Sequence, residues 1–193
     1  MNKKIVSPYT KTGDQGKTFL PGIGRVDKHH HMIDFIGTMD ELASILGVCI
    51  SFLPDSAIEL KKELILVQKN VLSMTTIIYS DKIKIEKETF KNIILNWELS
   101  IDNWLEEMAD NTFSFILPGG IHAASLLHVA RTICRRAERK LSYSCKISEL
   151  QGGEVLFAFI NRLSDYLFVM ARYINYINNS KEENWSFDRL LAD

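Results

Sequence analysis

The stretch 157–176 reads FAFINRLSDYLFVMARYINY, an apolar and aromatic run that contains few polar side chains. Asn161, Asp165 and Arg172 follow one another at steps of 4 and 7 residues, so a helix places them on one stripe. Buried polar groups are costly unless they are hydrogen-bonded or ion-paired. The stripe therefore predicts a polar partner on another helix of the fold.

A matching stripe lies upstream, in the segment 131–139, RTICRRAER, among small and apolar residues. Its members at helical spacing are Arg131, Arg135, Glu138 and Arg139. A solvent-exposed stripe paired with Glu138 is the ordinary interpretation, because charged runs usually face water. Guanidinium groups, however, suit bidentate recognition of phosphate better than lysine does. So many arginines on one stripe point to an anionic ligand.

The composition limits the class of protein. The chain has 193 residues, 46% of them hydrophobic and 24% charged, as expected for one soluble domain with a sizeable core. A net charge of −1 provides no global field for nucleic acid or a membrane, and we expect neither as a partner. We find no secretory signal and no run of about 18 apolar residues that predicts a membrane span. Cys49, Cys134 and Cys145 lack disulfide or metal-site spacing, which favours a reducing, cytoplasmic location.

Hydrophobic periodicity predicts an all-α fold, an antiparallel five-helix bundle of the up-down, ferritin-like kind. The predicted helices span about 33–53, 56–79, 87–110, 121–144 and 153–178. The chain is expected to form one domain, 1–193, with the bundle over about 32–178. Residues 1–31 are rich in glycine and are predicted as a long functional loop. Residues 179–193 are predicted as a polar tail that orders only against a partner.

The segment 9–18, YTKTGDQGKT, combines hydroxyls, lysines and glycines. Glycines allow a close approach of the backbone to a ligand, and successive N–H groups can form an anion-binding nest. Thr10, Thr12 and Thr18 can donate to phosphate oxygens. A P-loop is unlike this segment, since that motif needs glycine at Lys11 and a helix after Thr18. The residue types alone leave a solvated loop and a phosphate cradle equally open.

Other polar residues have ordinary explanations. Consecutive side chains rarely converge on one metal ion, so 29–31, three histidines, are predicted to lie in a solvated loop, and no metal ligand is assigned. His122 and His128 are predicted as helix-surface or hydrogen-bonded core residues. Asp40 is expected in a salt bridge, and Phe115 would ordinarily belong to the core.

Five segments in this order resemble the PduO-type cob(I)alamin adenosyltransferases, over about 9–178. They are YTKTGDQGKT at 9–18, GTMDEL at 37–42, FILPGG at 115–120, HVARTICRRAER at 128–139 and NRLSDYLFVMARYIN at 161–175. The resemblance implies a homotrimer of five-helix bundles that binds ATP in a cleft between adjacent subunits. It also implies attack of Co(I) on the 5′ carbon of ATP, with Mg²⁺ present, to give adenosylcobalamin and triphosphate.

The resemblance also assigns site residues by motif position. The ATP-binding loop would contain Thr10, Lys11, Thr12, Gly13, Asp14, Gly16 and Thr18, with Arg25 and Lys28 near the phosphates. The neighbouring subunit would contribute Arg131, Arg135, Glu138 and Asn161. Asp40 would pair across the interface with Arg131, and Phe115 would fill the lower face of the corrin site. The expected catalytic residues are Arg131, Arg135, Phe115 and Asp40.

The sequence departs from the family pattern in three places. One is the C-terminal segment 183–193, ENWSFDRLLAD, which does not align cleanly, so no residue there is assigned to close over the corrin, although Trp185 and Phe187 are available. Near the site, the chain reads KHHHM at 28–32 where the family commonly has K-D-D-P-R, and DELA at 40–43 where DELN is frequent. The latter two departures keep two alternatives open: an adenosylcobalamin carrier of the same fold, and a non-catalytic ATP-binding regulatory bundle. A reductase and a B12-dependent mutase are the further partners that the enzyme interpretation implies.

Overall fold

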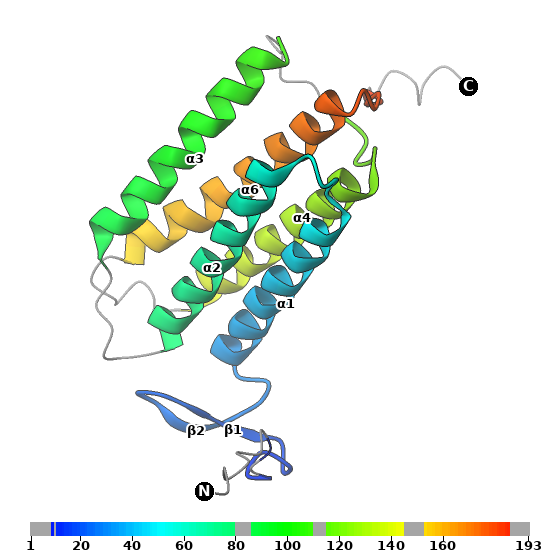
Figure 1. Ribbon diagram of the computed structural model, residues 1–193. Coiled ribbons are helices and arrows are strands. Elements are labelled where there is room, and N and C mark those ends of the chain that lie inside the picture. Colours follow the sequence, from blue (N-terminus) through cyan, green and yellow to red (C-terminus); the bar gives the residue numbers. More distant parts are fainter. Residues whose placement is uncertain (1–8, 10, 80–85, 110–114, 145–152, 186–193) are drawn as a thin grey trace, which may run out of the picture.

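The computed structural model describes residues 9, 11–79, 86–109, 115–144 and 153–185. Its five helices are α1 (His31–Phe52), α2 (Ile58–Tyr79), α3 (Lys87–Glu107), α4 (His122–Tyr143) and α6 (Gly153–Ile177). Each lies within three residues of its predicted bounds, and the mostly helical bundle is confirmed. Figure 1 shows α1 beside α2 and α4, with α6 between α4 and α3. The helix that contains the quoted stretch is therefore central to the bundle.

Aromatic rings join α3 to α6. Trp97 packs on Phe159 and Tyr166 with ring centroids 4.8 and 5.5 Å apart, and Trp104 packs on Tyr166 and Tyr173 at 5.2 and 5.3 Å. The residue numbers rise together along both helices, so this pair is parallel, although consecutive helices alternate in direction (Figure 1). Alternation of consecutive helices is what the up-down prediction requires, and α3 and α6, which are separated by α4, then run parallel. Steps of seven residues on both helices bring the same faces together at every second turn.

We predicted residues 1–31 as a long loop, but part of this segment forms β-strands. Strands β1 (Lys17–Leu20) and β2 (Gly24–Asp27) form an antiparallel hairpin in which Thr18 pairs with Val26. Leu20 is 1% exposed and joins the core, while the rest of the hairpin projects beyond the N-terminal end of α1 (Figure 1). The hairpin is thus anchored to the bundle through Leu20 and leaves most of its surface accessible.

Residues that follow α6 pack on their own chain, which corrects our expectation for the part of the tail that the structure describes. Ile116 and Asn184 form an antiparallel bridge. The N–H of Leu117 donates to the carbonyl of Glu183 at 2.8 Å, and the N–H of Trp185 donates to that of Phe115 at 2.8 Å. The segment 180–185 therefore pairs with the loop that precedes α4.

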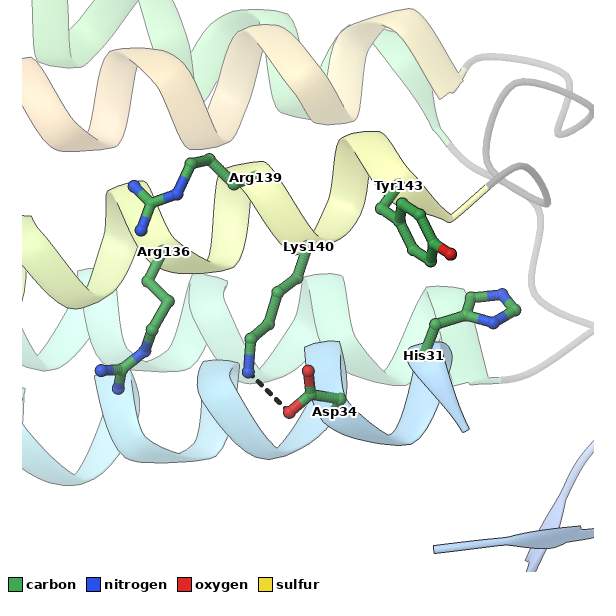
Figure 2. Close-up of a pocket in the computed structure, with 6 residues that line it drawn as sticks. All are labelled: His31, Asp34, Arg136, Arg139, Lys140 and Tyr143. Carbon is green, nitrogen blue, oxygen red and sulfur yellow. Dashed lines mark hydrogen bonds and ion pairs between the residues drawn. The ribbon is translucent and has the colours of Figure 1, made fainter. Parts of the chain in front are cut away.

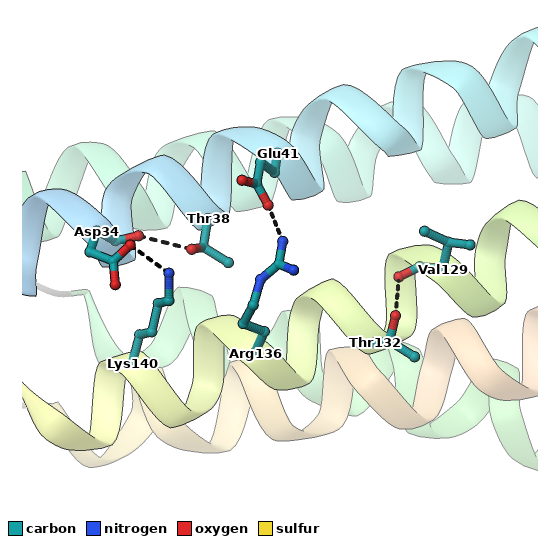
Figure 3. A network of polar contacts seen from close by, with 7 residues as sticks. All are labelled: Asp34, Thr38, Glu41, Val129, Thr132, Arg136 and Lys140. Carbon is teal, nitrogen blue, oxygen red and sulfur yellow. Dashed lines mark hydrogen bonds and ion pairs between the residues drawn. The ribbon is translucent and has the colours of Figure 1, made fainter.

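Helix α1 is long and apolar enough to cross a membrane by length and composition alone, with a mean hydropathy of 1.5, a test that core helices of soluble proteins also pass. In the bundle, α1 packs against α2 and α4 and buries Phe35, Met39 and Leu46 completely. Figure 3 shows the edge of α1 that faces α4, where Asp34 pairs with Lys140 at 2.6 Å and Glu41 pairs with Arg136. The apolar residues of α1 are therefore those of a helix packed into the core.

Candidate functional site

The central group of the candidate site lies on the seam between α4 and α6. Its members, which we call the α4–α6 cluster, are Arg131, Arg135, Glu138 and Asn161. The guanidinium carbon of Arg131 lies 5.7 Å from the centre of the Phe168 ring, while its Nε atom is buried without a hydrogen-bond partner. Burial, and then the charge of Arg135, lower the pKa of Arg131. A buried guanidinium N–H without a partner is costly, and no residue that the structure describes supplies one for this atom.

The other members of the α4–α6 cluster lie close by. The amide Nδ2 of Asn161 donates to Oε1 of Glu138 at 3.0 Å, which joins the two helices at the predicted positions. Arg135 is exposed and its backbone carbonyl accepts a hydrogen bond from Arg139 at 3.1 Å. Arg139 thus folds back along its own helix. Arg135 keeps its guanidinium available at the surface.

A second group of predicted site residues lies on the hairpin, and we call it the hairpin cluster. It contains Lys11, Thr12, Gly13, Asp14, Gly16, Thr18, Arg25 and Lys28, whereas Thr10 lies outside the described residues. Arg25 donates to the carbonyl of Thr12, and the N–H of Lys28 donates to the carbonyl of Gly16 at 2.8 Å. A Cβ added at Gly13 would lie 3.2 Å from the backbone carbonyl oxygen of Lys17 and 3.6 Å from Nζ of Lys28, so glycine avoids a tight backbone contact here. These contacts place the side chains of Arg25 and Lys28 beside one turn.

The turn of the hairpin cluster contains two residues in the left-handed region, Lys11 with φ of +58° and Gly16 with φ of +77°. Two N–H groups of the segment are used within the turn, because that of Asp14 donates to the carbonyl of Lys11 and that of Gly16 to the carbonyl of Gly13. The structure therefore shows a tight, internally hydrogen-bonded turn, and the phosphate cradle stays a prediction.

The two clusters lie apart within one chain. The strands of the hairpin pair with each other, and in the described part of the chain neither packs extensively on α4 or α6. Asp40 is exposed and makes no ion pair with any residue that the structure describes, whereas its neighbour Glu41 binds Arg136 across the α1–α4 seam. Within the described part of one copy, Asp40 therefore lacks an ion-pair partner and the Nε atom of Arg131 lacks a hydrogen-bond partner.

Phe115 is not a core residue, since its side chain is 70% exposed. The backbone of the loop that follows Phe115 is hydrogen-bonded to Asn175, a buried residue of α6. The Nδ2 of Asn175 donates to the carbonyl of Gly119 at 3.0 Å, and its Oδ1 accepts from the N–H of Ile121 at 3.1 Å. The aromatic ring is thus presented to the outside on a fixed backbone, as a ligand-contacting ring must be.

The stripe of polar residues on α6 divides into different roles. Asp165 is exposed and pairs with Arg162 at 2.7 Å, and Arg162 in turn binds Glu98 on α3 at 2.9 Å. Arg172 is buried and binds Glu182 at 2.9 Å. The predicted partner from α4 is seen for Asn161, which binds Glu138.

The histidines differ from our expectations. His30 caps α1, because its Nδ1 accepts the N–H of Met32 at 3.2 Å, and His31 is the first residue of that helix. His122 stacks on Phe52 at the surface, as predicted. His128 is buried, yet neither ring nitrogen has a hydrogen-bond partner, so the prediction of a hydrogen-bonded core residue was wrong. Burial, and then the charges of Arg131 and Arg172, lower the pKa of His128 to about 4.

A pocket of about 240 Å³ opens where α1 begins and α4 ends (Figure 2). Its lining consists of His31, Asp34, Arg136, Arg139, Lys140 and Tyr143. None of the predicted site residues lines it. Two of its cations are already engaged, because Lys140 pairs with Asp34 and Arg136 with Glu41. We therefore regard its charges chiefly as contacts between α1 and α4.

Sequence reasoning missed three residues that support the candidate site: Phe168, Asn175 and Glu182. Asn175 lies three residues after Arg172 in the quoted stretch, so helical spacing could have placed it on the same stripe. Glu182 carried no such signal, because it lies outside the helices and its contact with Arg172 on α6 depends on how the chain turns after that helix. Phe168 looked like any other apolar residue of α6.

Comparison with known proteins agrees with this geometry. Residues 8–174 match the family model described as cobalamin adenosyltransferase. The corrinoid adenosyltransferase of Bacillus subtilis (strain 168) is 38% identical over 173 residues, which is 86% of each chain. The human corrinoid adenosyltransferase MMAB is 32% identical over 176 residues, covering 88% of this chain and 69% of the human one.

Solved structures match over nearly the whole chain. A variant of the PduO-type ATP:corrinoid adenosyltransferase from Lactobacillus reuteri, complexed with cobalamin and ATP, superposes with a TM-score of 0.82 at 33% identity. The match covers 94% of this chain and 97% of that one. Another variant of the same protein, complexed with ATP, gives a TM-score of 0.80 at 34% identity. With both helical site segments inside the matched range, the chain belongs to the cobalamin adenosyltransferase family.

Proposed function

We propose that this protein transfers the 5′-deoxyadenosyl group of ATP to the cobalt of cob(I)alamin. The observation that carries the proposal is the α4–α6 cluster, in which the family arginines and the Glu138–Asn161 pair stand together with an unsatisfied Arg131. Related proteins are named corrinoid adenosyltransferases, and the Lactobacillus reuteri structures are described as complexes with cobalamin and ATP. Both substrates are expected to bind here as well.

We propose further that the active form is a homotrimer with sites shared between adjacent copies. The hairpin cluster and the α4–α6 cluster lie apart in one chain, so one copy cannot surround a nucleotide with both. A neighbouring copy could place its hairpin over the α4–α6 cluster and its Asp40 against Arg131. An opposite charge is the partner that a half-buried guanidinium favours. This single contact would give Asp40 an ion-pair partner and the Nε atom of Arg131 a hydrogen-bond partner.

In the reaction, Co(I) attacks the 5′ carbon of ATP, the C5′–O bond breaks, and triphosphate leaves with its bonding electrons. The cobalt supplies the electron pair of the new Co–C bond and becomes formally Co(III). The protein need not supply a nucleophile, so its tasks are positioning and charge stabilisation. Lys11, Arg131 and Arg135 would stabilise the charge that develops on the leaving triphosphate. The turn around Gly13 and Gly16 would hold the phosphates in place before attack.

Magnesium is expected to arrive with the nucleotide. The described residues contain no group of three or more histidine, cysteine, aspartate or glutamate side chains that could hold a metal ion. Mg²⁺ prefers to keep several waters and to bind substrate phosphates, with few protein ligands. We therefore propose Mg–ATP as the substrate, without a resident metal site in these parts of the chain. The ion would neutralise triphosphate charge together with the arginines.

Phe115 has the position required for a corrin contact. Its exposed ring would lie under the corrin and keep the lower axial base away from the cobalt. Loss of an axial donor makes Co(II) easier to reduce, because that donor stabilises the higher oxidation state. A reductase is then the partner that delivers the electron, and a B12-dependent mutase is the class of enzyme that uses the product. We propose a cytoplasmic location for this exchange.

The experiment that tests the proposed function is an anaerobic assay. The full chain is supplied with ATP, Mg²⁺ and chemically reduced cobalamin, and the absorbance of cob(I)alamin is followed. We expect the cob(I)alamin spectrum to decay to that of adenosylcobalamin over many turnovers. Tight product binding without turnover would identify a carrier instead. Binding of ATP that leaves the corrin spectrum unchanged would identify a regulatory bundle.

A further inference from the structure

The described tail determines where the Phe115 loop lies. Two backbone hydrogen bonds of 2.8 Å connect Phe115 and Leu117 to Trp185 and Glu183. The rings of Phe115 and Trp185 meet edge to face, with centroids 6.3 Å apart. Backbone pairing on one side leaves the loop little freedom to move without the tail. Whatever holds the tail therefore also positions Phe115.

Arg172 is the side chain that holds the tail from the bundle. Its Nε donates to Oε2 of Glu182 at 2.9 Å, and the two side chains are only 10% and 18% exposed. Shielding from water makes such a charge-assisted bond much stronger than an ion pair at the surface. Asn175 adds a hydrogen bond to the backbone, since its carbonyl accepts the N–H of Ser180 at 2.9 Å. The segment 180–185 is therefore fastened at both of its ends.

Arg172 also contacts the Phe168 ring, which in turn contacts Arg131 on the nucleotide side of the proposed site. The guanidinium carbons of Arg172 and Arg131 lie 5.9 and 5.7 Å from the centre of that ring. A cation near an aromatic face is attracted by the ring quadrupole, so the ring helps to orient both guanidinium groups. A continuous set of contacts thus runs from Phe115 to Arg131.

We propose that Arg172 is a positioning residue that holds the Phe115 loop, through Glu182 and the tail, in register with Arg131, through Phe168. The proposal rests on the proposed function for the roles of Phe115 and Arg131. It adds that the corrin-facing ring and the triphosphate-facing arginine are placed by one buried ion pair and one aromatic ring. Neither Arg172 nor Glu182 is required to contact a substrate.

The test uses Glu182→Gln, a change of nearly constant shape at a residue outside the helices. We expect amide hydrogen exchange at Leu117 and Trp185 to accelerate about tenfold, because local opening becomes easier. The KM for cob(I)alamin should rise about tenfold while the KM for ATP stays within about twofold, since one charge-assisted hydrogen bond has been lost on the corrin side only. The matched control is Glu98→Gln, which removes another glutamate–arginine contact to α6 and should change none of these values.

A second variant tests the link to Arg131. Phe168→Leu removes the ring and keeps an apolar side chain, so the amides of Leu117 and Trp185 should stay protected. The KM for ATP should rise about tenfold, because Arg131 loses the ring that orients it.

The proposal is overturned if Glu182→Gln leaves the two amides as protected as in the unmodified protein, or if Glu98→Gln has the same effect. An equal rise of both KM values in Glu182→Gln would likewise contradict it. Hydrogen exchange needs no turnover, so absence of activity in the unmodified protein would refute the proposed function and leave this test of Arg172 intact.

Discussion

Arg131 lies over Phe168, with 5.7 Å between its guanidinium carbon and the ring centre, and its Nε atom is buried without a hydrogen bond. The arginine is therefore oriented by an aromatic face and left with an unused donor. Such a side chain can bind an anion without first breaking a contact within its own chain. Preorganised donors of this kind contribute most where charge develops during a reaction.

Replacement of Arg131 by alanine should sharply reduce turnover. We expect kcat to fall about 100-fold or more, the range found when one donor to a developing charge is removed. Thermal unfolding should change little, because the guanidinium Nε makes no hydrogen bond in the described chain. The control is Arg139→Ala on the same helix, since the Arg139 guanidinium donates to the carbonyl of Arg135 on its own helix and is not part of the α4–α6 cluster. Steady-state kinetics of Arg131→Ala that match the unmodified protein would remove Arg131 from the site.

Replacement of Phe115 by alanine should separate the two substrates. The ring is 70% exposed, so its loss should barely affect stability. We expect ATP affinity, measured by calorimetry, to remain within about twofold, because the nucleotide contacts lie elsewhere. Reduction of Co(II) bound to the protein should become much harder, as followed by spectroscopy under a fixed reductant. Leu99→Ala, at an exposed residue of α3, is the control. An equal loss of ATP affinity in Phe115→Ala would make the ring a structural element.

Gly120 should be intolerant of any side chain. Its φ is +103°, and an added Cβ would overlap the side-chain amide of Asn175. Gly120→Ala should therefore lower the free energy of unfolding by about 2 kcal/mol or more, through backbone strain and loss of the Asn175 hydrogen bonds. Gly119→Ala is the control, since its nearest contact is 3.9 Å away. Denaturant unfolding that ranks the two variants equally would contradict this account of the loop.

His128 should make the stability depend on pH. Its folded pKa of about 4 lies below the ordinary value of 6.5, so the unfolded chain binds the extra proton more readily between these values. The stabilisation is complete above about pH 6.5 and is lost as the pH falls toward 4, by about 3 kcal/mol in total. The physical reason is that a protonated ring would be buried beside the charges of Arg131 and Arg172.

The measurement is the pH dependence of unfolding for His128→Phe against the unmodified protein. This variant keeps an aromatic ring and cannot bind a proton, so its unfolding free energy should fall less steeply between pH 6.5 and 4. His122→Phe, at an exposed histidine, should retain the slope of the unmodified protein. Identical slopes for all three proteins would show that His128 does not titrate as described.

Periodicity predicted the helices well because each has an amphipathic pattern that burial in the bundle explains. It did not predict that α3 and α6 run parallel, although Trp97 and Trp104 on α3 and Tyr166 and Tyr173 on α6 share a step of seven residues. Equal spacing shows that each helix has aromatic residues on one face, but it does not determine which two helices pack together.

The candidate site could be predicted only in part. Arg131 and Asn161 were found because helical spacing places polar groups on a face. The hairpin was missed because Lys17–Leu20 and Gly24–Asp27 are too short to show alternation clearly. The contact of Arg172 with Glu182 depends on where the chain turns after α6, and local sequence does not determine that path.

The central claim is that each substrate site contains the hairpin of one copy and the α4–α6 cluster of another. It is tested most directly by coexpressing two inactive variants, Arg25→Ala on the hairpin and Arg131→Ala on α4, and measuring cob(I)alamin turnover. In randomly assembled trimers, a site is intact only if its hairpin comes from the Arg131→Ala variant and its α4–α6 cluster from the Arg25→Ala variant. Each condition is met about half of the time, so the mixture should recover about a quarter of the unmodified activity per site. If each site were built within one copy, every site would carry a defect, and the mixture would be as inactive as its two components.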